Sequence, residues 1–514
     1  MRTFAAKISK ELFEKDMKSL KTLMVGLLLA ATSTSALAGG ILTNTNQSID
    51  FLRNPARDAA IGLDGVYSNP AGVAFLPEGF HLGLNWQYAH QTRTITSTNP
   101  VFALGRKNNG ATVKEFEGVA DAPVIPSIQA AWNKGDWSLQ LNFSVPGGGG
   151  KCEFADGLGS FESVVGSIAS QLRPLGATGY DMDGYMQGRQ YYFGFQVGSA
   201  YKINKDLSVY GGLRLLWGSA TYKAKISNIQ VKIEGDGYMD FGSFLSSSTA
   251  TVDGALARVS AGMAQMEAAG ATALPQYAEL QAQKAQLEGT RSSLDALQKY
   301  SQGVNLLCNQ SSVGVAPVVG IDYRTGRFNL AAKYEFKTQI RMKNESSVNE
   351  ASEIQAVNKF RDGEEVNEDQ PALLSLGVQY SPIDAVRVNL GFHHYFDKDA
   401  DWYGNSQRML DHDTNEYLAG VEWDINDRLT ASCGGQLTRY GLTDQYMNDM
   451  SFVVNSYSLG FGANYKLSDK VTLKAAYFQT NYGTYRRTDY PAAGVSDSFT
   501  RSNRVIGIGC DLTL

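Results

Sequence analysis

The chain has 514 residues and a formal net charge of −5; only 19% of its residues are charged, whereas 53 are glycine, 26 tyrosine and 23 phenylalanine. Abundant aromatic residues and glycines with few charges favour many strands and tight turns over a helical enzyme. The negative net charge gives no indication of nucleic-acid binding.

The N-terminus contains the three parts of a secretory signal peptide in order. Residues 17–21 form a basic region, residues 23–31 an apolar core, and residues 36–38 the cleavage sequence Ala-Leu-Ala. We therefore expect residues 1–38 to be removed, with the signal itself beginning at Met17. Beyond this region no uncharged apolar run approaches the roughly 18 residues that a transmembrane helix requires. An exported membrane protein without such runs must be a closed barrel.

Residues 39–76 show no strand pattern, yet they precede the first strand. The segment opens on two glycines and ends close to the motif Asn69-Pro70-Ala71-Gly72. Proline fixes its own φ and biases the preceding residue towards an extended conformation. The Asn69–Pro70 pair therefore predicts a rigid exit from this segment into the first strand.

Apolar residues alternate with polar or small ones in a long series of segments that begins at residue 80. The pattern recurs at residues 80–89, 137–145, 191–198, 207–217, 328–337, 386–393, 417–424, 429–438, 457–466, 471–477 and 506–514. In a barrel wall, lipid-facing and lumen-facing residues alternate in this way. A soluble sandwich alternates too, but it would not place aromatic residues outward on nearly every strand.

Connections between these segments fall into two classes that alternate along the chain. Six are short turns, at residues 133–136, 204–206, 325–327, 382–384, 425–427 and 468–470. Seven are long and polar, at about residues 97–122, 148–185, 226–311, 344–369, 397–412, 441–453 and 483–500. These thirteen connections predict an all-β fold. It would be a fourteen-stranded antiparallel transmembrane β-barrel with short periplasmic turns and long outer loops.

The long connection 226–311 changes character part-way. From residue 252 to residue 307 the strand pattern stops, and a sequence rich in Ala, Gln, Leu and Glu follows, interrupted at Leu274-Pro275. Leucines at near-heptad spacing predict a helical hairpin in this outer loop. Residues 158–172 predict a shorter amphipathic helix in the preceding outer loop. Whether these helices serve the barrel's function or only decorate it stays open.

The signal peptide, the Asn69-Pro70-Ala71-Gly72 motif and the predicted barrel together resemble the FadL/TodX family. The resemblance covers residues 39–514 and implies that residues 39–76 form a hatch in the lumen and residues 77–514 the barrel. In that family the Asn-Pro-Ala sequence is the signature of the hatch. Two features depart from the family pattern: the large helical insertion, and a C-terminus that ends in Leu514 instead of an aromatic residue.

The resemblance implies passive uptake of hydrophobic molecules, with long-chain fatty acids as candidate substrates, across the bacterial outer membrane. The substrate would bind at the outer loops, pass to a lumen pocket near the N-terminus and leave sideways through a gap in the wall. A fourteen-strand barrel is wide enough for a water-filled pore, so a plug suits a hydrophobic solute. The implied partners are outer-membrane lipid, lipopolysaccharide and the barrel-assembly machinery. The resemblance implies a monomer that needs no cofactor, metal or nucleic acid.

Four apolar residues of the N-terminal segment are available for the ligand pocket: Ile41, Leu42, Phe51 and Leu52. A fatty-acid carboxylate would also need a cation. Strand parity turns five cations towards the lumen: Arg214, Lys333, Lys337, Arg387 and Lys474. Arg214 and Arg387 are the preferred candidates, since a guanidinium can hold a carboxylate through two hydrogen bonds. The alternative is that the inward cations pair with inward acids, namely Asp322, Glu335 and Glu422.

Catalytic and metal sites are not expected. His393 and His394 are neighbours on a strand and point to opposite faces, so they cannot chelate a metal together. With five histidines and no serine-centred motif, the chain offers no set of nucleophile, base and orienting partner. A general diffusion porin and a surface adhesin or structural barrel built on the helical hairpin remain as alternative functions.

The four cysteines divide into two pairs. Cys152 and Cys308 fall in adjacent outer loops, whereas Cys433 and Cys510 have lipid-facing parity on separated strands. We expect a Cys152–Cys308 disulfide that tethers the helical hairpin to the neighbouring loop. Closing so long a loop would contribute roughly 2–4 kcal/mol.

Overall fold

The structure, a computed structural model, describes residues 41–298, 300–348 and 359–514. The predicted signal peptide, residues 1–38, lies outside these described residues, as do Gly39 and Gly40. Among the described residues, no helix combines the length and the apolar character needed to cross a membrane.

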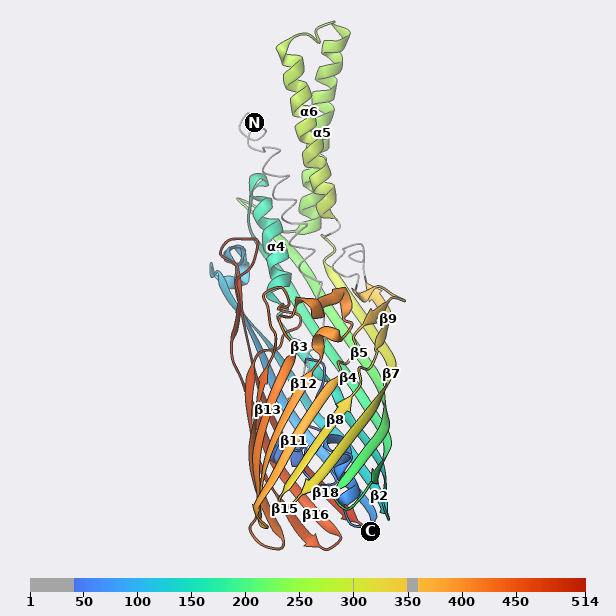
Figure 1. The fold of residues 1–514 in the computed structure, drawn as a ribbon. Coiled ribbons are helices and arrows are strands. Elements are labelled where there is room, and N and C mark those ends of the chain that lie inside the picture. The colour runs from blue at the N-terminus through green and yellow to red at the C-terminus, as the bar shows by residue number, and fades with distance from the viewer. Residues whose placement is uncertain (1–40, 299, 349–358) are drawn as a thin grey trace.

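Fourteen long strands of the described chain close into one antiparallel barrel (Figure 1). In chain order they are β1 (Gly79–Thr98), β2 (Val113–Lys134), β3 (Trp137–Phe154), β4 (Ala177–Lys202), β5 (Leu207–Ile233), β7 (Val304–Thr325), β8 (Phe328–Glu335), β11 (Leu373–Ile383), β12 (Val386–Tyr395), β13 (Thr414–Asp424), β14 (Leu429–Arg439), β15 (Ser456–Ser468), β16 (Val471–Tyr482) and β18 (Ser496–Thr513). Each long strand pairs with the next, and β18 pairs with β1 to close the wall. The predicted fourteen-stranded all-β barrel is confirmed.

Four further strands of the described chain extend the sheet at its outer end: β6 (Gly237–Asp240), β9 (Arg341–Val348), β10 (Glu365–Asn367) and β17 (Tyr485–Arg487). The outer surface of the barrel is apolar and its inner surface is buried. On β5, Leu213, Leu215 and Trp217 are 53%, 44% and 55% exposed, whereas Arg214 and Leu216 between them are 3% and 0% exposed. A wall that faces lipid requires this apolar exterior.

At the end of the barrel with the long connections, the strands run further than the sequence pattern predicted. β2 begins inside the predicted loop 97–122. β5 ends at Ile233 and β7 begins at Val304, both inside the predicted loop 226–311. Lipid imposes an apolar outer face only where the wall crosses the membrane. Beyond the membrane, towards the outer loops, the strands stay paired although outward side chains such as Lys223 and Lys225 are charged. The alternation therefore ends before the strand does.

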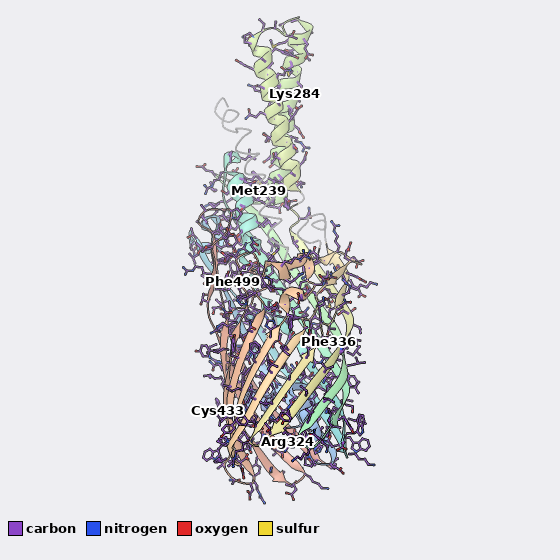
Figure 2. All side chains as sticks on the ribbon, in the orientation of Figure 1. Met239, Lys284, Arg324, Phe336, Cys433 and Phe499 are labelled. Atoms are coloured by element: carbon purple, nitrogen blue, oxygen red, sulfur yellow. The ribbon has the colours of Figure 1, made fainter. Side chains whose placement is uncertain are left out.

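The predicted helical hairpin projects beyond the barrel mouth (Figure 1). It consists of α5 (Phe241–Ala268) and α6 (Pro275–Gln298), so it starts earlier than residue 252. Asp240 caps α5 by accepting a hydrogen bond of 2.8 Å from the Ser243 backbone N–H. Lys284 on α6 lies far from the barrel, whereas Arg324 lies near the opposite end (Figure 2). The predicted helix at residues 158–172 is α4 (Gly159–Gln171).

Residues 41–76, called the lumen segment below, lie inside the barrel (Figure 1). They form two short helices and a 3₁₀ turn: α2 (Ile49–Arg53), α3 (Gly65–Ser68) and η1 (Gly72–Phe75). From residue 41 to residue 60 every residue is buried. The barrel wall therefore encloses this segment.

The predicted Cys152–Cys308 disulfide is wrong, because both thiols are buried and free. Cys152 lies on β3 and Cys308 on β7, in one row across the sheet that passes through Gly188 on β4 and Tyr222 on β5. Three strand spacings separate the two cysteines by about 14 Å. A disulfide needs Cα atoms within about 7 Å. Both residues belong to strands that the sequence pattern had assigned to loops.

Candidate functional site

The lumen segment lies directly against the wall where the wall carries glycines. A Cβ atom added to Gly420 on β13 would lie 1.9 Å from the Asn54 side chain, and one added to Gly460 on β15 would lie 2.0 Å from the Leu52 carbonyl oxygen. Only residues without a side chain permit so close an approach of the lumen segment to the wall. These glycines therefore form the part of the wall against which residues 52–54 pack.

Buried ion pairs join the lumen segment to the wall at the periplasmic end. The guanidinium of Arg53 lies 2.7 Å from Asp50 and 2.6 Å from Glu422 on β13. Lys474 on β16 bonds to Asp50 as well, and lies 2.5 Å from Asp511 on β18. Burial alone would raise the pKa of Asp50, but Lys474 and Arg53 hold that pKa well below its usual range. The charges are thus mutually neutralised inside the barrel.

The Asn69-Pro70-Ala71-Gly72 motif anchors the segment to the wall. Asn69 donates a hydrogen bond of 2.6 Å to Asp322 on β7 and accepts one of 3.2 Å from the Gly72 backbone N–H. The carbonyl oxygens of Pro70 and Ala71 each accept a bond of 2.7 Å from wall side chains. A Cβ atom at Gly72 would lie 2.4 Å from the Asn69 amide nitrogen. Each position of the motif therefore has a distinct structural task at this corner.

Two apolar clusters join other parts of the lumen segment to the rest of the protein. The outer cluster joins Ile41 and Leu42 to apolar residues of the outer loops and helices, including Phe360, Trp402 and Phe452. The inner cluster joins four residues of the lumen segment to the wall: Ile49, Phe51, Leu52 and Ala56 with Ala89, Ile125, Val145, Leu418, Ala476, Phe478 and Val505. The four apolar residues predicted for a ligand pocket are all buried, two in each cluster.

The pairing of β2 with β3 is interrupted beside the inner cluster. Ala120 pairs with Cys152 and Ile128 pairs with Phe143, but residues 121–127 of β2 and 144–151 of β3 have no partner in this ladder. This stretch, called the wall break below, contains Pro123 and Pro126 on β2 and the sequence Pro-Gly-Gly-Gly-Gly at residues 146–150 on β3. Proline has no backbone N–H to donate, so it disfavours continuous pairing.

The lumen segment covers the wall break from inside. The Gln47 side chain bonds to both the backbone N–H and the carbonyl oxygen of Val145 on β3, at 3.0 and 3.1 Å. Its own carbonyl oxygen accepts bonds from Ser127 at 2.6 Å and Gln129 at 3.0 Å, both on β2. The Asn44 backbone N–H bonds to the Pro146 carbonyl oxygen at 2.9 Å. Gln47 therefore links both edges of the break.

Solved structures share this barrel fold. A FadL homologue of Pseudomonas aeruginosa superposes with a TM-score of 0.58 at 12% identity, covering 92% of this chain and 100% of that one. The toluene transporter TodX of P. putida gives a TM-score of 0.54 at 16% identity, covering 88% and 94%. The fold is that of FadL and TodX. No protein-family model and no curated protein matches the sequence.

Within this FadL-type fold, the two arginines preferred for a substrate carboxylate contact the chain's own acids. Arg214 forms an ion pair with Glu335 on β8 and lies 4.9 Å from the ring centre of Tyr67. Arg387 bonds to both oxygens of Asp424, at 2.6 and 2.8 Å. Both arginines therefore follow the alternative prediction, in which inward cations pair with inward acids.

Sequence reasoning missed two further inward cations, which form a pair. Arg93 on β1 and Arg501 on β18 are direct cross-strand neighbours and are 5% and 6% exposed. Both donate to the side-chain oxygen of Gln91, at 2.9 and 3.0 Å. They lie beside the outer cluster, since Arg501 also donates to the carbonyl oxygen of Phe452. The predicted strand 80–89 ended too early to include Arg93.

Proposed function

We propose that this protein is an outer-membrane channel through which hydrophobic molecules pass inward without energy input. The substrate moves from the outer loops into the lumen and leaves sideways through the wall break. One observation carries the proposal: apolar residues line both stages of this route. The outer cluster reaches Ile41 and Leu42, and the inner cluster leads from Phe51 and Leu52 to Ile125 at the wall break. Such a lining spares a hydrophobic solute contact with water.

The filled lumen supports a hydrophobic-molecule channel over a general porin. A porin needs a continuous water-filled passage. Here Arg57 of the lumen segment binds Asp64 at 2.8 Å and Glu422 of the wall at 3.0 Å, deep inside the barrel. We accordingly assign residues 39–76 as a hatch, residues 77–514 as the barrel and residues 1–38 as a cleaved signal. The structural neighbour TodX, a toluene transporter by name, is consistent with a hydrophobic substrate.

A long-chain fatty acid is the substrate class that we favour, because Arg93 and Arg501 suit its carboxylate. Two buried guanidinium groups in direct cross-strand register repel one another. A carboxylate placed between them would offset this repulsion, while its alkyl chain would contact the outer cluster at Ile95 and Phe499. Arg93 and Arg501 therefore replace Arg214 and Arg387 as candidate headgroup ligands.

The route is tested by placing charges at the wall break. An Ile125→Asp/Val145→Asp variant should lower uptake of both a long-chain fatty acid and a neutral hydrocarbon at least about tenfold, because an unpaired charge in an apolar site is costly for such a solute. The matched control is Ile125→Leu/Val145→Ile, which keeps both side chains apolar and adds only one methylene group. Heat-modifiable migration on gels would show that both variants are folded. Unchanged uptake by the Asp variant would contradict lateral passage at this site.

The headgroup assignment has its own test. An Arg93→Gln/Arg501→Gln variant should take up fatty acid several-fold more slowly and neutral hydrocarbon at the normal rate. Equal loss for both substrates would show that the arginines only support the structure. Ion conductance of the wild-type protein in planar bilayers at the level of an open porin would favour the alternative function.

A further inference from the structure

An aromatic group marks the outer edge of the lipid-facing band on β3, β4 and β5. The rings of Tyr191 and Phe193 lie 5.9 Å apart, and Phe193 lies 5.8 Å from Trp217 and 6.4 Å from Phe143. Below these rings the outward residues are apolar, as Phe195 and Leu215 show. Aromatic girdles of this kind sit at the level of the lipid headgroups.

Basic residues follow immediately beyond this girdle on the same outer face. Arg189 is the next outward residue after Tyr191 on β4, and its cross-strand neighbours are Lys151 on β3 and Thr221 on β5. Lys223 and Lys225 are the following outward residues of β5. Lys343 on β9 pairs with Ser311 of β7. Ser311 is two residues from Asn309, which lies in the row of Arg189, and is on the side towards the girdle. These five residues, Lys151, Arg189, Lys223, Lys225 and Lys343, are all exposed and are called the basic surface.

The basic surface has an excess of positive charge. Lys151 pairs with Glu153 at 2.7 Å, whereas Lys223, Lys225 and Lys343 form no salt bridge with any described residue. Two further acids lie on the same rows: Glu345, and Glu365 directly across from Lys343. With Glu153 they make three acids against five cations, so a net positive charge remains. The outward face of β2, in contrast, carries Glu115, Glu117 and Asp121. Positive charge is therefore concentrated on one side of the barrel, at headgroup height.

We propose that the basic surface binds the phosphate groups of an outer-leaflet glycolipid, a lipopolysaccharide. The girdle seats the acyl chains against Phe195 and Trp217, so the lipid's phosphates come level with the cations directly beyond. Strand spacings of about 4.8 Å and two-residue rises of about 7 Å set the cations apart by distances that a bisphosphorylated headgroup can span. A guanidinium such as that of Arg189 can hold a phosphate through two hydrogen bonds.

The test compares two full-length variants that lose the same charges at opposite ends of the barrel. The surface variant carries Arg189→Gln, Lys223→Gln, Lys225→Gln and Lys343→Gln. The control variant carries Lys205→Gln, Arg428→Gln, Lys466→Gln and Lys470→Gln, which are exposed residues at the periplasmic turns. Each protein, purified in detergent, is titrated with bisphosphorylated lipid A, dephosphorylated lipid A or inorganic phosphate. Thermal stabilisation and glycolipid retained through purification are measured.

Bisphosphorylated lipid A should stabilise the wild-type and control proteins, with an apparent affinity at least about tenfold weaker for the surface variant. Added salt should weaken that affinity, since the charges are exposed. Equal binding by the surface and control variants would overturn the proposal. So would equal binding of the dephosphorylated form, or full stabilisation by inorganic phosphate alone, which would assign the site to a free anion. Heat-modifiable migration of both variants keeps a folding failure distinguishable.

Discussion

Arg57 and Arg291 each contact two carboxylates of their own chain, the first inside the barrel and the second on the helical hairpin. The Arg57 side chain is 5% exposed and binds Asp64 and Glu422. The Arg291 side chain is 30% exposed and binds Asp253 at 2.8 Å and also Asp295. The local chemistry is nearly the same, but one network joins the hatch to the wall and the other joins α6 to α5.

Burial decides what each network contributes. Removing one partner of a buried pair strands the other charge away from water, which costs about 3–5 kcal/mol. Exposed pairs contribute about 0–1 kcal/mol, because water and salt screen them. Buried charges therefore help to hold the lumen segment in place, whereas the hairpin packs against the barrel through apolar residues at its base: Phe244, Leu245 and Leu294. Charge alone does not reveal which role a residue has.

The largest effect should come from removing the apolar part of the hatch. Deletion of residues 41–52 takes away all four predicted pocket residues and also Gln47, which links the edges of the wall break. We expect uptake of a hydrophobic substrate to be abolished while the barrel folds and inserts. Uptake assays on cells with equal amounts of inserted protein provide the measurement. Normal uptake would mean that the lumen segment has no transport role.

The Arg57→Ala variant should destabilise the lumen segment strongly, by about 3–5 kcal/mol, because Asp64 would remain buried without its cation. Glu422 would keep its ion pairs with Arg53 and Arg387. Limited proteolysis from the periplasmic side should cut the lumen segment in this variant and spare it in the wild type. A hatch that stays resistant would show that the remaining contacts to Arg53 suffice.

The Asn69→Ala variant should have an intermediate effect. It removes the 2.6 Å bond to Asp322, which keeps a bond of 2.8 Å from Asn329. The expected loss is about 1–3 kcal/mol of hatch stability, the cost of an incompletely satisfied buried group. Uptake should fall only mildly. A loss as complete as that of the 41–52 deletion would indicate that the motif does more than anchor the hatch.

The smallest effect should come from Arg291→Ala, the exposed counterpart of Arg57→Ala. The melting temperature should hardly change and uptake should be unaffected, because water and salt screen the exposed pair. Thermal melts followed by circular dichroism at a helix-sensitive wavelength would measure the hairpin. A large shift would mean that Arg291 is protected from water by a surface beyond the described chain.

The sequence predicts the fold wherever lipid constrains the side chains. Alternation identified most of the strands that cross the membrane, and Gly326 marks one of the turns at the periplasmic end. Above the membrane this constraint disappears, so the predicted strand 207–217 ended too early and left out Lys223 and Lys225, which lie in β5. The Cys152–Cys308 disulfide was mistaken for the same reason, because both cysteines lie in strand ends that the pattern had assigned to loops.

The candidate site was only partly predictable, for a different reason. The motif at Asn69 and the apolar residues near Phe51 are local features and were found from the sequence. The partners of the hatch are not local: Asp50 bonds to Lys474, which is 424 residues further on. The wall break did leave a signal, since Pro123, Pro126 and the glycines at 147–150 interrupt otherwise regular strands. That signal points to an interruption, but not to Gln47 as the residue that covers it.

The bonds between Phe80 and Leu514 bear on the order of events when the protein is made. Each residue donates its backbone N–H to the other's carbonyl oxygen, at 3.1 and 2.8 Å, where the barrel seam ends and the hatch leaves the lumen. Strand β18, which follows the other strands in the chain, thus completes the wall around residues 41–76. The lumen segment must therefore stay soluble and close to the forming barrel until β18 joins the wall. The polar residues of that segment are buried in the folded protein, but water can hydrate them before the barrel closes.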